Sequence, residues 1–224
     1  MEGCRVNIVF DLDGTLIDSA PDLQTAVNLM LEGEGKPPLD LPTITSFIGN
    51  GLPKLVERSL DARGISQSRY PQLCDTVRDF YSAAPADLTR PYPGVTEALR
   101  ALKAAGHRLG VCTNKPEEPA LLVLHLLGLG GFFDVVVGGD TLERKKPDPE
   151  PLEHVFAALG DGARLYVGDS EVDAETARRT GVRFALFTEG YRKQPVAALP
   201  HDWRFAEFDA LPGIVAALSQ TAPA

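Results

Sequence analysis

Short runs of mostly apolar residues alternate along the chain with longer stretches in which apolar residues recur every three or four positions. The runs predict buried strands at residues 6–10, 109–112, 135–137, 164–167 and 184–187. The longer stretches predict helices at residues 96–105, 117–127, 150–159 and 172–180, with a last helix ending near residue 218. Strands that alternate with helices predict a parallel sheet covered by helices on both faces.

Residues 18–84 follow a different pattern, with helical periodicity and no convincing strand. Ser19 precedes Pro21, so its hydroxyl is expected to cap a helix that carries proline in its first turn. Further helical patches are predicted at residues 43–48, 52–60 and 67–83. We therefore expect an α/β protein with a parallel-sheet, three-layer core and a small all-α domain inserted after the first strand. The core takes residues 1–17 and 85–224, and the inserted domain takes residues 18–84.

The composition indicates an ordinary globular protein, since 44% of the 224 residues are apolar and 24% are charged. A net charge of −9 argues against a nucleic-acid partner, because binding a phosphate backbone requires a basic face. Cys4, Cys74 and Cys112 cannot all pair and show no metal-ligand spacing, which favours a reducing compartment. Residues 1–5 do not resemble a secretory signal, and polar residues interrupt the longest apolar stretch, 121–137. We expect a cytoplasmic protein with no membrane partner.

Polar side chains gather where the predicted strands end. They are Asp11 and Asp13 after the first strand, Thr113 and Asn114 after residue 112, Lys145 and Lys146 after residue 137, and Asp169 with Asp173 after residue 167. The carboxyl ends of parallel strands lie along one edge of a sheet, so these side chains are expected to converge. Clustered carboxylates suit Mg²⁺, which prefers oxygen ligands and the phosphate oxygens of a substrate.

Four motifs in this order resemble those of the haloacid dehalogenase-like phosphohydrolases: Asp11-Leu12-Asp13-Gly14-Thr15, Thr113, Lys146-Pro147, and Gly168-Asp169-Ser170 with Asp173. The resemblance covers the chain from its first strand to Asp173 and implies a Rossmann-like core with a helical cap. Three further segments resemble the bacterial phosphoglycolate phosphatase branch of that family: residues 47–51, 92–95 and 113–116. Residues 171–172, 178–179 and 189–198 follow the branch loosely, which leaves the exact substrate open.

The resemblance implies that Asp11 is the nucleophile and forms an aspartyl-phosphate. Asp13 would protonate the leaving alkoxide and later deprotonate the attacking water. The presence of aspartate at this position favours a phosphatase over a dehalogenase. Mg²⁺ would be held by the Asp11 carboxylate, the Asp13 backbone carbonyl and Asp169, with Asp173 directly behind them.

The same resemblance assigns the phosphate site and the substrate-facing part of the cap. Thr113, the backbone amides near Asn114, and Lys146 would bind the phosphate oxygens and neutralise charge. The cap residues implied to face the substrate are Gly49, Asn50 and Gly51, with Lys54 and Arg58 one helical turn apart. Lys54 or Arg58 could reach a distal carboxylate of the substrate, although a solvated helix face is the default interpretation for both.

Several residues have simpler interpretations. A calcium-binding EF-hand loop is disfavoured because Leu16 stands where that pattern needs glycine and Asp22 where it needs glutamate. Lys145 is a rival of Lys146, which the resemblance selects because proline follows it. Asp169 could cap the next helix, a role for which Ser170 competes. Gly49 and Gly51 could simply form a turn.

The function expected from these features is Mg²⁺-dependent hydrolysis of a small phosphorylated metabolite, with 2-phosphoglycolate as the leading substrate. The enzymatic alternatives are a sugar-phosphate phosphatase and a β-phosphoglucomutase-like enzyme. The non-enzymatic alternative is a catalytically dead phosphate-sensing or scaffold protein, against which the complete motifs argue. Monomer and homodimer are both compatible with the sequence.

Overall fold

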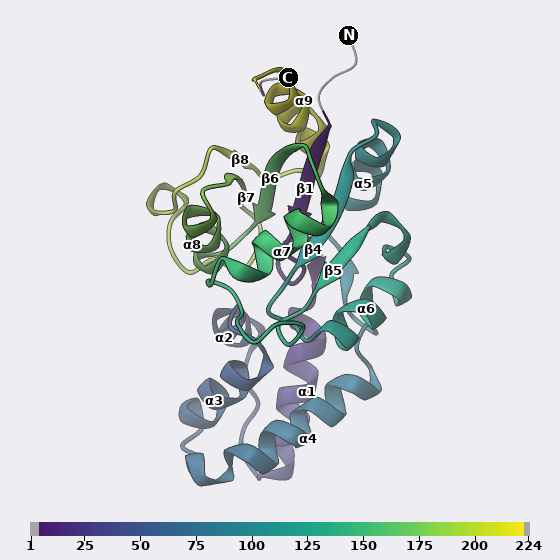
Figure 1. Cartoon of the computed structure of the whole chain (residues 1–224). Helices are drawn as coiled ribbons and strands as arrows, with labels where there is room; N and C mark the ends of the chain where they lie inside the picture. The colour runs from purple at the N-terminus through teal and green to yellow at the C-terminus, as the bar shows by residue number, and fades with distance from the viewer. Residues whose placement is uncertain (1–4, 222–224) are drawn as a thin grey trace.

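A parallel sheet forms the centre of the larger part of the molecule (Figure 1). The computed structural model describes residues 5–221, and within these residues the strands are ordered β5-β4-β1-β6-β7-β8. Their bounds are β1 Val6–Phe10, β4 Arg108–Cys112, β5 Val135–Val137, β6 Ala163–Gly168, β7 Arg183–Phe187 and β8 Trp203–Phe205. All neighbouring strands in this sheet pair in parallel. The predicted α/β class is confirmed.

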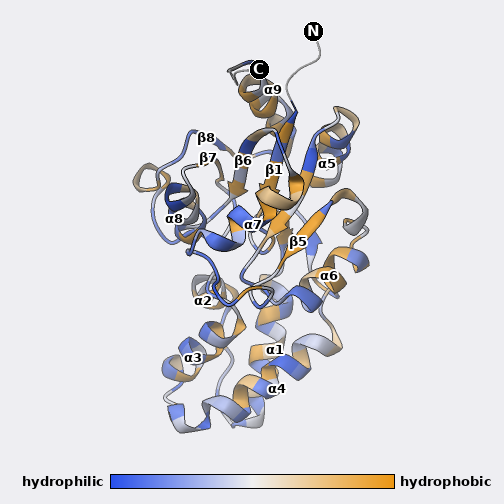
Figure 2. Ribbon diagram, in the orientation of Figure 1, coloured by the Kyte–Doolittle hydropathy of each residue, from blue (hydrophilic) through white to orange (hydrophobic). Residues whose placement is uncertain are grey.

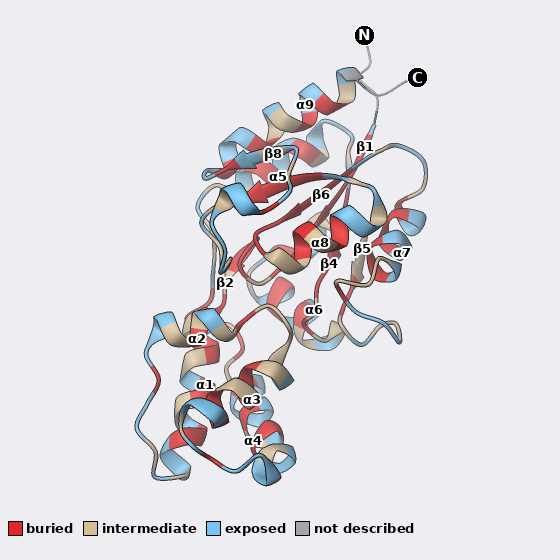
Figure 3. Ribbon diagram, turned by 90° about the vertical axis from the view of Figure 1, so that its left-hand side faces the viewer, coloured by how far each residue is buried: buried red, intermediate tan, exposed pale blue. Residues whose placement is uncertain are grey.

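Helices cover both faces of this sheet because its strands bury side chains in both directions. Ile8 and Phe10 pack with the apolar residues of α5 (Val95–Ala104), α6 (Glu117–Leu126) and α9 (Leu211–Thr221). Val9, between them, packs on the opposite face with α7 (Glu150–Leu159) and α8 (Glu171–Thr180). The alternation of Ile8, Val9 and Phe10 between two cores follows from the two-residue period of a strand. Figure 3 shows the buried strands between exposed helix surfaces.

Four helices form the second, smaller part of the molecule, which Figure 1 places below the sheet. Their bounds are α1 Ala20–Gly33, α2 Leu41–Phe47, α3 Leu52–Ala62 and α4 Tyr70–Ala83, with a 3₁₀ turn at Gln67–Arg69. They share an apolar core of their own, and their apolar residues alternate with polar surface residues (Figure 2). Tyr191, from the loop after β7, belongs to this core as well. Tyr191 thus helps to pack the larger part against the smaller one.

Two short chain segments connect the parts. They are β2 (Ile17–Asp18) and β3 (Arg90–Pro91), which pair antiparallel. The carboxylate of Asp22 accepts hydrogen bonds from the backbone N–H groups of Leu88 and Thr89 and from the Thr89 hydroxyl. Because Asp22 is buried, these bonds supply the partners that its desolvated carboxylate needs. The chain leaving the sheet and the chain returning to it are therefore tied together.

Some local predictions were wrong. The hydroxyl of Ser19 does not cap α1 but donates a hydrogen bond to Asp13 Oδ1 at 2.6 Å. The α-helix predicted to start at residue 67 starts at Tyr70, after the 3₁₀ turn. Strand β8 and the pair β2–β3 were not predicted.

The cysteines and the membrane question can be addressed for residues 5–221. Cys74 and Cys112 are buried and free, while Cys4 lies outside the described residues. Within the same range, every helix is too short or too polar to cross a lipid bilayer.

Candidate active site

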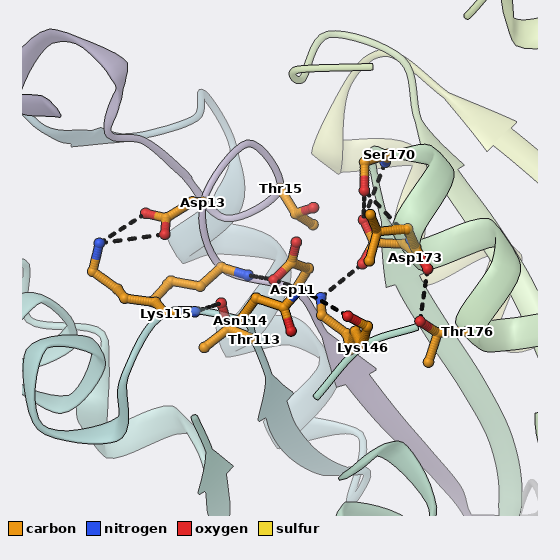
Figure 4. A network of polar contacts seen from close by, with 12 residues as sticks. Asp11, Asp13, Thr15, Thr113, Asn114, Lys115, Lys146, Ser170, Asp173 and Thr176 are labelled. Carbon is orange, nitrogen blue, oxygen red and sulfur yellow. Dashed lines mark hydrogen bonds and ion pairs between the residues drawn. The ribbon is translucent and has the colours of Figure 1, made fainter. Parts of the chain in front are cut away.

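The polar side chains predicted to converge do meet at the carboxyl ends of β1, β4 and β6 (Figure 4). The turn after β1 brings the chain close to Asp169, and Gly14 makes this approach possible. Its φ of 89° is in the left-handed region, and a Cβ there would lie 2.7 Å from an Asp169 oxygen. The Thr15 hydroxyl donates a hydrogen bond of 2.7 Å to the other oxygen of Asp169. This hydrogen bond connects the first motif, at Thr15, to the fourth motif, at Asp169.

Asp11 extends from the end of β1 into this cluster. Its Oδ1 accepts a hydrogen bond from the Leu12 N–H at 2.7 Å and lies 2.9 Å from the Lys146 ammonium. Burial and the negative charge of Asp173 raise the pKa of Asp11 from 3.8 to about 7, although Lys146 acts in the opposite direction. A carboxylate held in this way is costly to ionise until further positive charge arrives.

Three carboxylates form the acidic cluster of the site. Oxygen atoms of Asp11, Asp169 and Asp173 all lie within 4.8 Å of one another. Burial, with the charges of Asp173 and Asp11, raises the pKa of Asp169 well above its usual range. Such mutual repulsion is what a divalent cation relieves, and oxygen ligands are the kind that Mg²⁺ prefers. The residues present therefore fit a magnesium site.

Asp173 differs from the other two acids because its oxygens are already fully engaged by the protein. Oδ2 accepts hydrogen bonds from the backbone N–H groups of Asp169 and Ser170 and from the Ser170 hydroxyl. Oδ1 accepts from Lys146 and from the Tyr166 hydroxyl. Although burial opposes ionisation, Lys146 and these hydrogen bonds lower the pKa of Asp173. The role that the resemblance implied for Asp173, behind the metal ligands, stays a prediction.

Lys146 is buried in the centre of the cluster, whereas Lys145 is exposed. Its ammonium lies 2.9 Å from Asp11, 2.8 Å from Asp173 and 2.9 Å from the Tyr166 hydroxyl. Burial alone would lower the pKa of Lys146, but the two carboxylates raise it above its usual range. Lys146 is therefore a permanent cation beside Asp11.

Asp13 lies on the other side of the first-motif turn and faces the smaller part of the molecule. Its carboxylate accepts a hydrogen bond from the Ser19 hydroxyl and is paired with the ammonium of Lys115 at 3.2 Å. The Lys115 side chain is only 6% exposed and lies over the ring of Tyr81 from α4. Lys115 was not singled out by the sequence. The only available signal was its position two residues after Thr113, within a segment that matched the branch.

Thr113 and Asn114 lie at the end of β4. The Thr113 hydroxyl accepts a hydrogen bond from the N–H of Lys115, which shapes the turn after the strand. The Asn114 side-chain amide donates to the carbonyl oxygens of Gly49 at 3.3 Å and Lys146 at 3.1 Å. Asn114 thus connects the loop between α2 and α3 to the loop that carries Lys146.

A cavity of about 480 Å³ separates the sheet edge from the four helices. Its walls include Asp11, Asp13, Thr113, Asn114, Lys115, Ile48, Gly49, Gly51 and Tyr81. Lys54 and Arg58 are not part of this wall: Lys54 pairs with Glu57, and Arg58 donates to the Phe47 carbonyl and to Asn50 Oδ1. Arg58 supports the loop from which Gly49 and Gly51 reach the cavity, and Asn50 faces a smaller pocket beside Asp169.

Two tyrosines also belong to the site, although the sequence did not point to them. Tyr166 bonds to both Lys146 and Asp173. The backbone N–H of Tyr191 donates to Asp169 Oδ2, and its hydroxyl accepts from the N–H groups of Ser19 and Ala20. Tyr191 consequently links an acid of the cluster to the start of α1.

Comparison with known proteins identifies the family. The family model of the haloacid dehalogenase-like hydrolases matches residues 8–187. The chain belongs to this family. The segment matched runs from β1 to the end of β7 and includes every residue of the four motifs.

Relatives within the haloacid dehalogenase-like family cover nearly the whole chain. A phosphoglycolate phosphatase of Cereibacter sphaeroides strain ATCC 17029 is 51% identical over 210 residues, which are 93% of this chain and 96% of the relative. A phosphoglycolate phosphatase of Rhodobacter capsulatus is 43% identical over 93% of this chain and 95% of its own. The crystal structure of a predicted phosphoglycolate phosphatase from Haemophilus somnus 129PT superposes with a TM-score of 0.88 at 30% identity, covering 96% of this chain and 99% of its own. The expected resemblance to this branch is confirmed.

Proposed function

We propose that this protein is a phosphatase that hydrolyses 2-phosphoglycolate to glycolate and inorganic phosphate. The observation that carries the chemistry is the convergence of Asp11, Asp13 and Lys146 at one sheet edge, where Asp11 and Asp13 line a cavity. The substrate is supported by the identity of 51% to a protein named phosphoglycolate phosphatase.

Asp11 is the nucleophile of the proposed reaction. Both donors that contact its carboxylate, the Leu12 N–H and the Lys146 ammonium, bind Oδ1. Oδ2 is therefore the oxygen that attacks phosphorus, forming an aspartyl-phosphate while the bond to the alkoxide breaks. Lys146 neutralises charge as two anions meet, which is the main requirement of phosphoryl transfer. Thr113 and the backbone near Asn114 bind the phosphate oxygens that do not react.

Asp13 is the proposed general acid and base. It donates a proton to the departing glycolate oxygen and then removes one from the water that hydrolyses the aspartyl-phosphate. Ser19 and Lys115 hold its carboxylate toward the cavity. Acid catalysis is needed because an alkoxide is a poor leaving group.

Asp11, Asp169 and the backbone carbonyl of Asp13 are the proposed ligands of Mg²⁺, with Asp173 holding the loop behind them. When bound, Mg²⁺ supplies the positive charge that stabilises the transferring phosphoryl group. Asp169 accepts hydrogen bonds from Thr15 and Tyr191, so its orientation is fixed by the protein alone.

We further propose that the four helices act as a cap that excludes water from the cavity and contacts the part of the substrate beyond its phosphate. In this proposal residues 18–84 are the cap and residues 1–17 and 85–224 are the core. Gly49, Asn50 and Gly51 form the loop of the cap that meets the site, and Arg58 supports it. We also propose that the protein is cytoplasmic. Its proposed assembly is a monomer or a homodimer, and sedimentation of the purified protein tests the oligomeric state.

A phosphate-release panel tests the function. It compares 2-phosphoglycolate with hexose phosphates, β-glucose 1-phosphate and nucleotides, in Mg²⁺ and in chelator. We expect 2-phosphoglycolate to have the highest kcat/KM and chelator to abolish turnover. Activity that survives chelation, or normal turnover by Asp11→Asn, contradicts the mechanism. Equal rates on 2-phosphoglycolate and hexose phosphates contradict the substrate and leave the phosphatase chemistry in place.

A further inference from the structure

Lys115 is a buried cation of the cavity wall for which the four motifs provide no role. Its ammonium lies 3.2 and 3.3 Å from the two oxygens of Asp13 and 4.6 Å from the centre of the Tyr81 ring. Figure 4 shows the side chain extending away from Asp11 toward Asp13. Lys115 therefore lies beside the proposed acid, on the side away from the nucleophile.

Burying an ammonium is unfavourable unless anions and hydrogen-bond acceptors surround it. Lys115 has three donor protons, and its one carboxylate partner, Asp13, is also the group proposed to exchange protons with the substrate. Close by, the Tyr81 hydroxyl is buried and forms no hydrogen bond of standard geometry among residues 5–221, although it lies near enough to the Lys115 ammonium to help raise the pKa of that lysine. An ammonium and a hydroxyl whose proton is free to donate, in the same cavity wall, form a site suited to a small anion.

The other charged groups of this wall are less suited to that role. Arg78 lines the cavity, but its side chain is 55% exposed and pairs with Asp75. Glu118 and Asp140 also line it, and both are exposed at the rim, where their charge disfavours anions. Lys115 is the desolvated cation of the described wall, so an anion bound there gains the most from it.

We propose that Lys115 binds the carboxylate of the substrate, with the Tyr81 hydroxyl as a second donor. This role rests on the proposed function and specifies the substrate class as phosphate esters of small 2-hydroxy acids. In 2-phosphoglycolate a single methylene carbon separates the ester oxygen from the carboxylate. When Asp13 contacts the ester oxygen, the carboxylate consequently falls within ion-pair reach of the neighbouring ammonium. Lys115 thereby both binds the carboxylate of the substrate and positions the side chain of Asp13.

The test compares selectivity rather than activity alone. Lys115→Met is assayed with 2-phosphoglycolate, with ethyl phosphate, which keeps the alkyl leaving group but lacks the carboxylate, and with p-nitrophenyl phosphate, which needs no acid. We expect the ratio of kcat/KM for 2-phosphoglycolate over ethyl phosphate to fall about 100-fold, mainly through KM. Lys103→Met, at a surface lysine on α5 that pairs with Asp134, is the matched control and leaves the ratio unchanged.

Two further variants keep the proposal testable if Lys115→Met does not fold. Tyr81→Phe keeps the ring and removes the hydroxyl, and should lower the same ratio about fivefold. Lys115→Arg keeps the charge and should retain more of the ratio than Lys115→Met. Parallel losses on 2-phosphoglycolate and ethyl phosphate, with p-nitrophenyl phosphate spared, overturn the proposal, since Lys115 then only positions Asp13.

Failure of the proposed function gives a different result. A wild-type enzyme with equal kcat/KM for 2-phosphoglycolate and ethyl phosphate has no carboxylate selectivity, and both proposals fall. A wild-type enzyme with strong selectivity that Lys115→Met and Tyr81→Phe leave intact overturns only the role of Lys115.

Discussion

Asp11, the proposed nucleophile, has a pKa close to neutral pH because of its surroundings. Its side chain is only 12% exposed, lies close to Asp169 and Asp173, and contacts Lys146. With a pKa of about 7, Asp11 is costly to ionise at neutral pH while no cation occupies the cluster. The clustered carboxylates thus lower the stability of the folded protein, a cost that is common where charged groups are arranged for function.

Asp11→Asn is expected to abolish turnover and to stabilise the metal-free protein. A carboxyl group with a raised pKa in the folded state lowers stability above its unfolded value of 3.8, and its full cost applies above about 7. At pH 8 the variant should gain up to about 4 kcal/mol, or roughly 8–16 °C in Tm. The gain should shrink to about half at pH 5.5. Thermal unfolding in chelator measures this, and a lower Tm for the variant at pH 8 contradicts the argument.

Asp13→Asn tests the acid role separately from the nucleophile. We expect kcat on 2-phosphoglycolate to fall about 10²–10⁴-fold, because an amide cannot donate the proton that the alkoxide needs. On p-nitrophenyl phosphate, whose leaving group is stable as an anion, the loss should stay below about tenfold. Steady-state kinetics on the two substrates provide the measurement. Equal losses on both would assign Asp13 to structure or metal binding instead.

The sequence located Asp11, Asp13, Lys146, Asp169 and Asp173 because motif order and predicted strand ends both place them at one edge. It could not locate Lys115 or Tyr191, since nothing in composition separates a buried lysine or tyrosine from a surface one. Their roles depend on contacts between residues more than 100 positions apart, such as Lys115 with Asp13. The burial of Lys115 and Tyr191 is what indicates their roles in the site, and burial is known only once the fold is known.

At the scale of elements, α8 carries the capping box that orders the fourth motif. Ser170 caps the helix, and the carboxylate of Asp173, three residues later, accepts a hydrogen bond from the N–H of Ser170. The sequence left open whether Asp169 or Ser170 caps α8, and the structure assigns the cap to Ser170. Asp169 is therefore free to face Asp11, and helix capping and the acidic cluster depend on the same turn.

Ser170→Ala is expected to destabilise the protein by about 1–2 kcal/mol, because it removes the cap and one partner of the Asp173 carboxylate. The variant should also bind Mg²⁺ less tightly, since the loop carrying Asp169 loses an anchor. Denaturant unfolding and Mg²⁺ titration of the Tm measure the two effects. Ser219→Ala, which removes an α9 hydroxyl bonded to its own helix, is the control and should change neither.

The longer elements were predictable and the shortest were not. Strands β1, β4, β6 and β7 are mostly apolar because both their faces are buried, so their pattern is clear. β8 is a three-residue edge strand in which Trp203 and Arg204 are not buried, and its existence depends on pairing with β7. Ser19 had the residue type of a cap, but Asp13, six residues earlier, accepts the hydrogen bond of its hydroxyl. Strand pairing decided the first case and a local competitor for the hydroxyl decided the second.

At the scale of the whole molecule, the proposed cap and core meet through contacts that converge on the site. Tyr191 joins Asp169 to the start of α1, Asn114 joins the β4 loop to Gly49, and Lys115 lies between Asp13 and Tyr81. The sequence predicted an inserted helical segment but not these contacts, since each joins residues that are distant along the chain. Binding of a ligand at the site should therefore raise the free energy of unfolding of the whole protein.

Mg²⁺ is expected to raise the Tm of the whole protein in a pH-dependent manner. At a concentration of about 100 times its Kd, a ligand of the folded state adds about 2.7 kcal/mol, or roughly 5–10 °C for a chain of this size. Protons compete with the metal for Asp11 and Asp169, whose pKa values are raised. The increase should thus be full at pH 8 and less than about half as large at pH 5.5.

Two variants make this thermal-shift measurement decisive. Asp169→Asn should remove most of the Mg²⁺-induced increase at pH 8, because it takes one carboxylate from the cluster. Asp61→Asn, at an exposed carboxylate of α3 that accepts a hydrogen bond from Gln67, should keep the full increase. A shift of equal size at both pH values, or one that survives in Asp169→Asn, would place the metal elsewhere. If the Mg²⁺-induced increase in Tm instead follows the protonation of Asp11, the same carboxyl group controls metal binding and the stability of the whole protein.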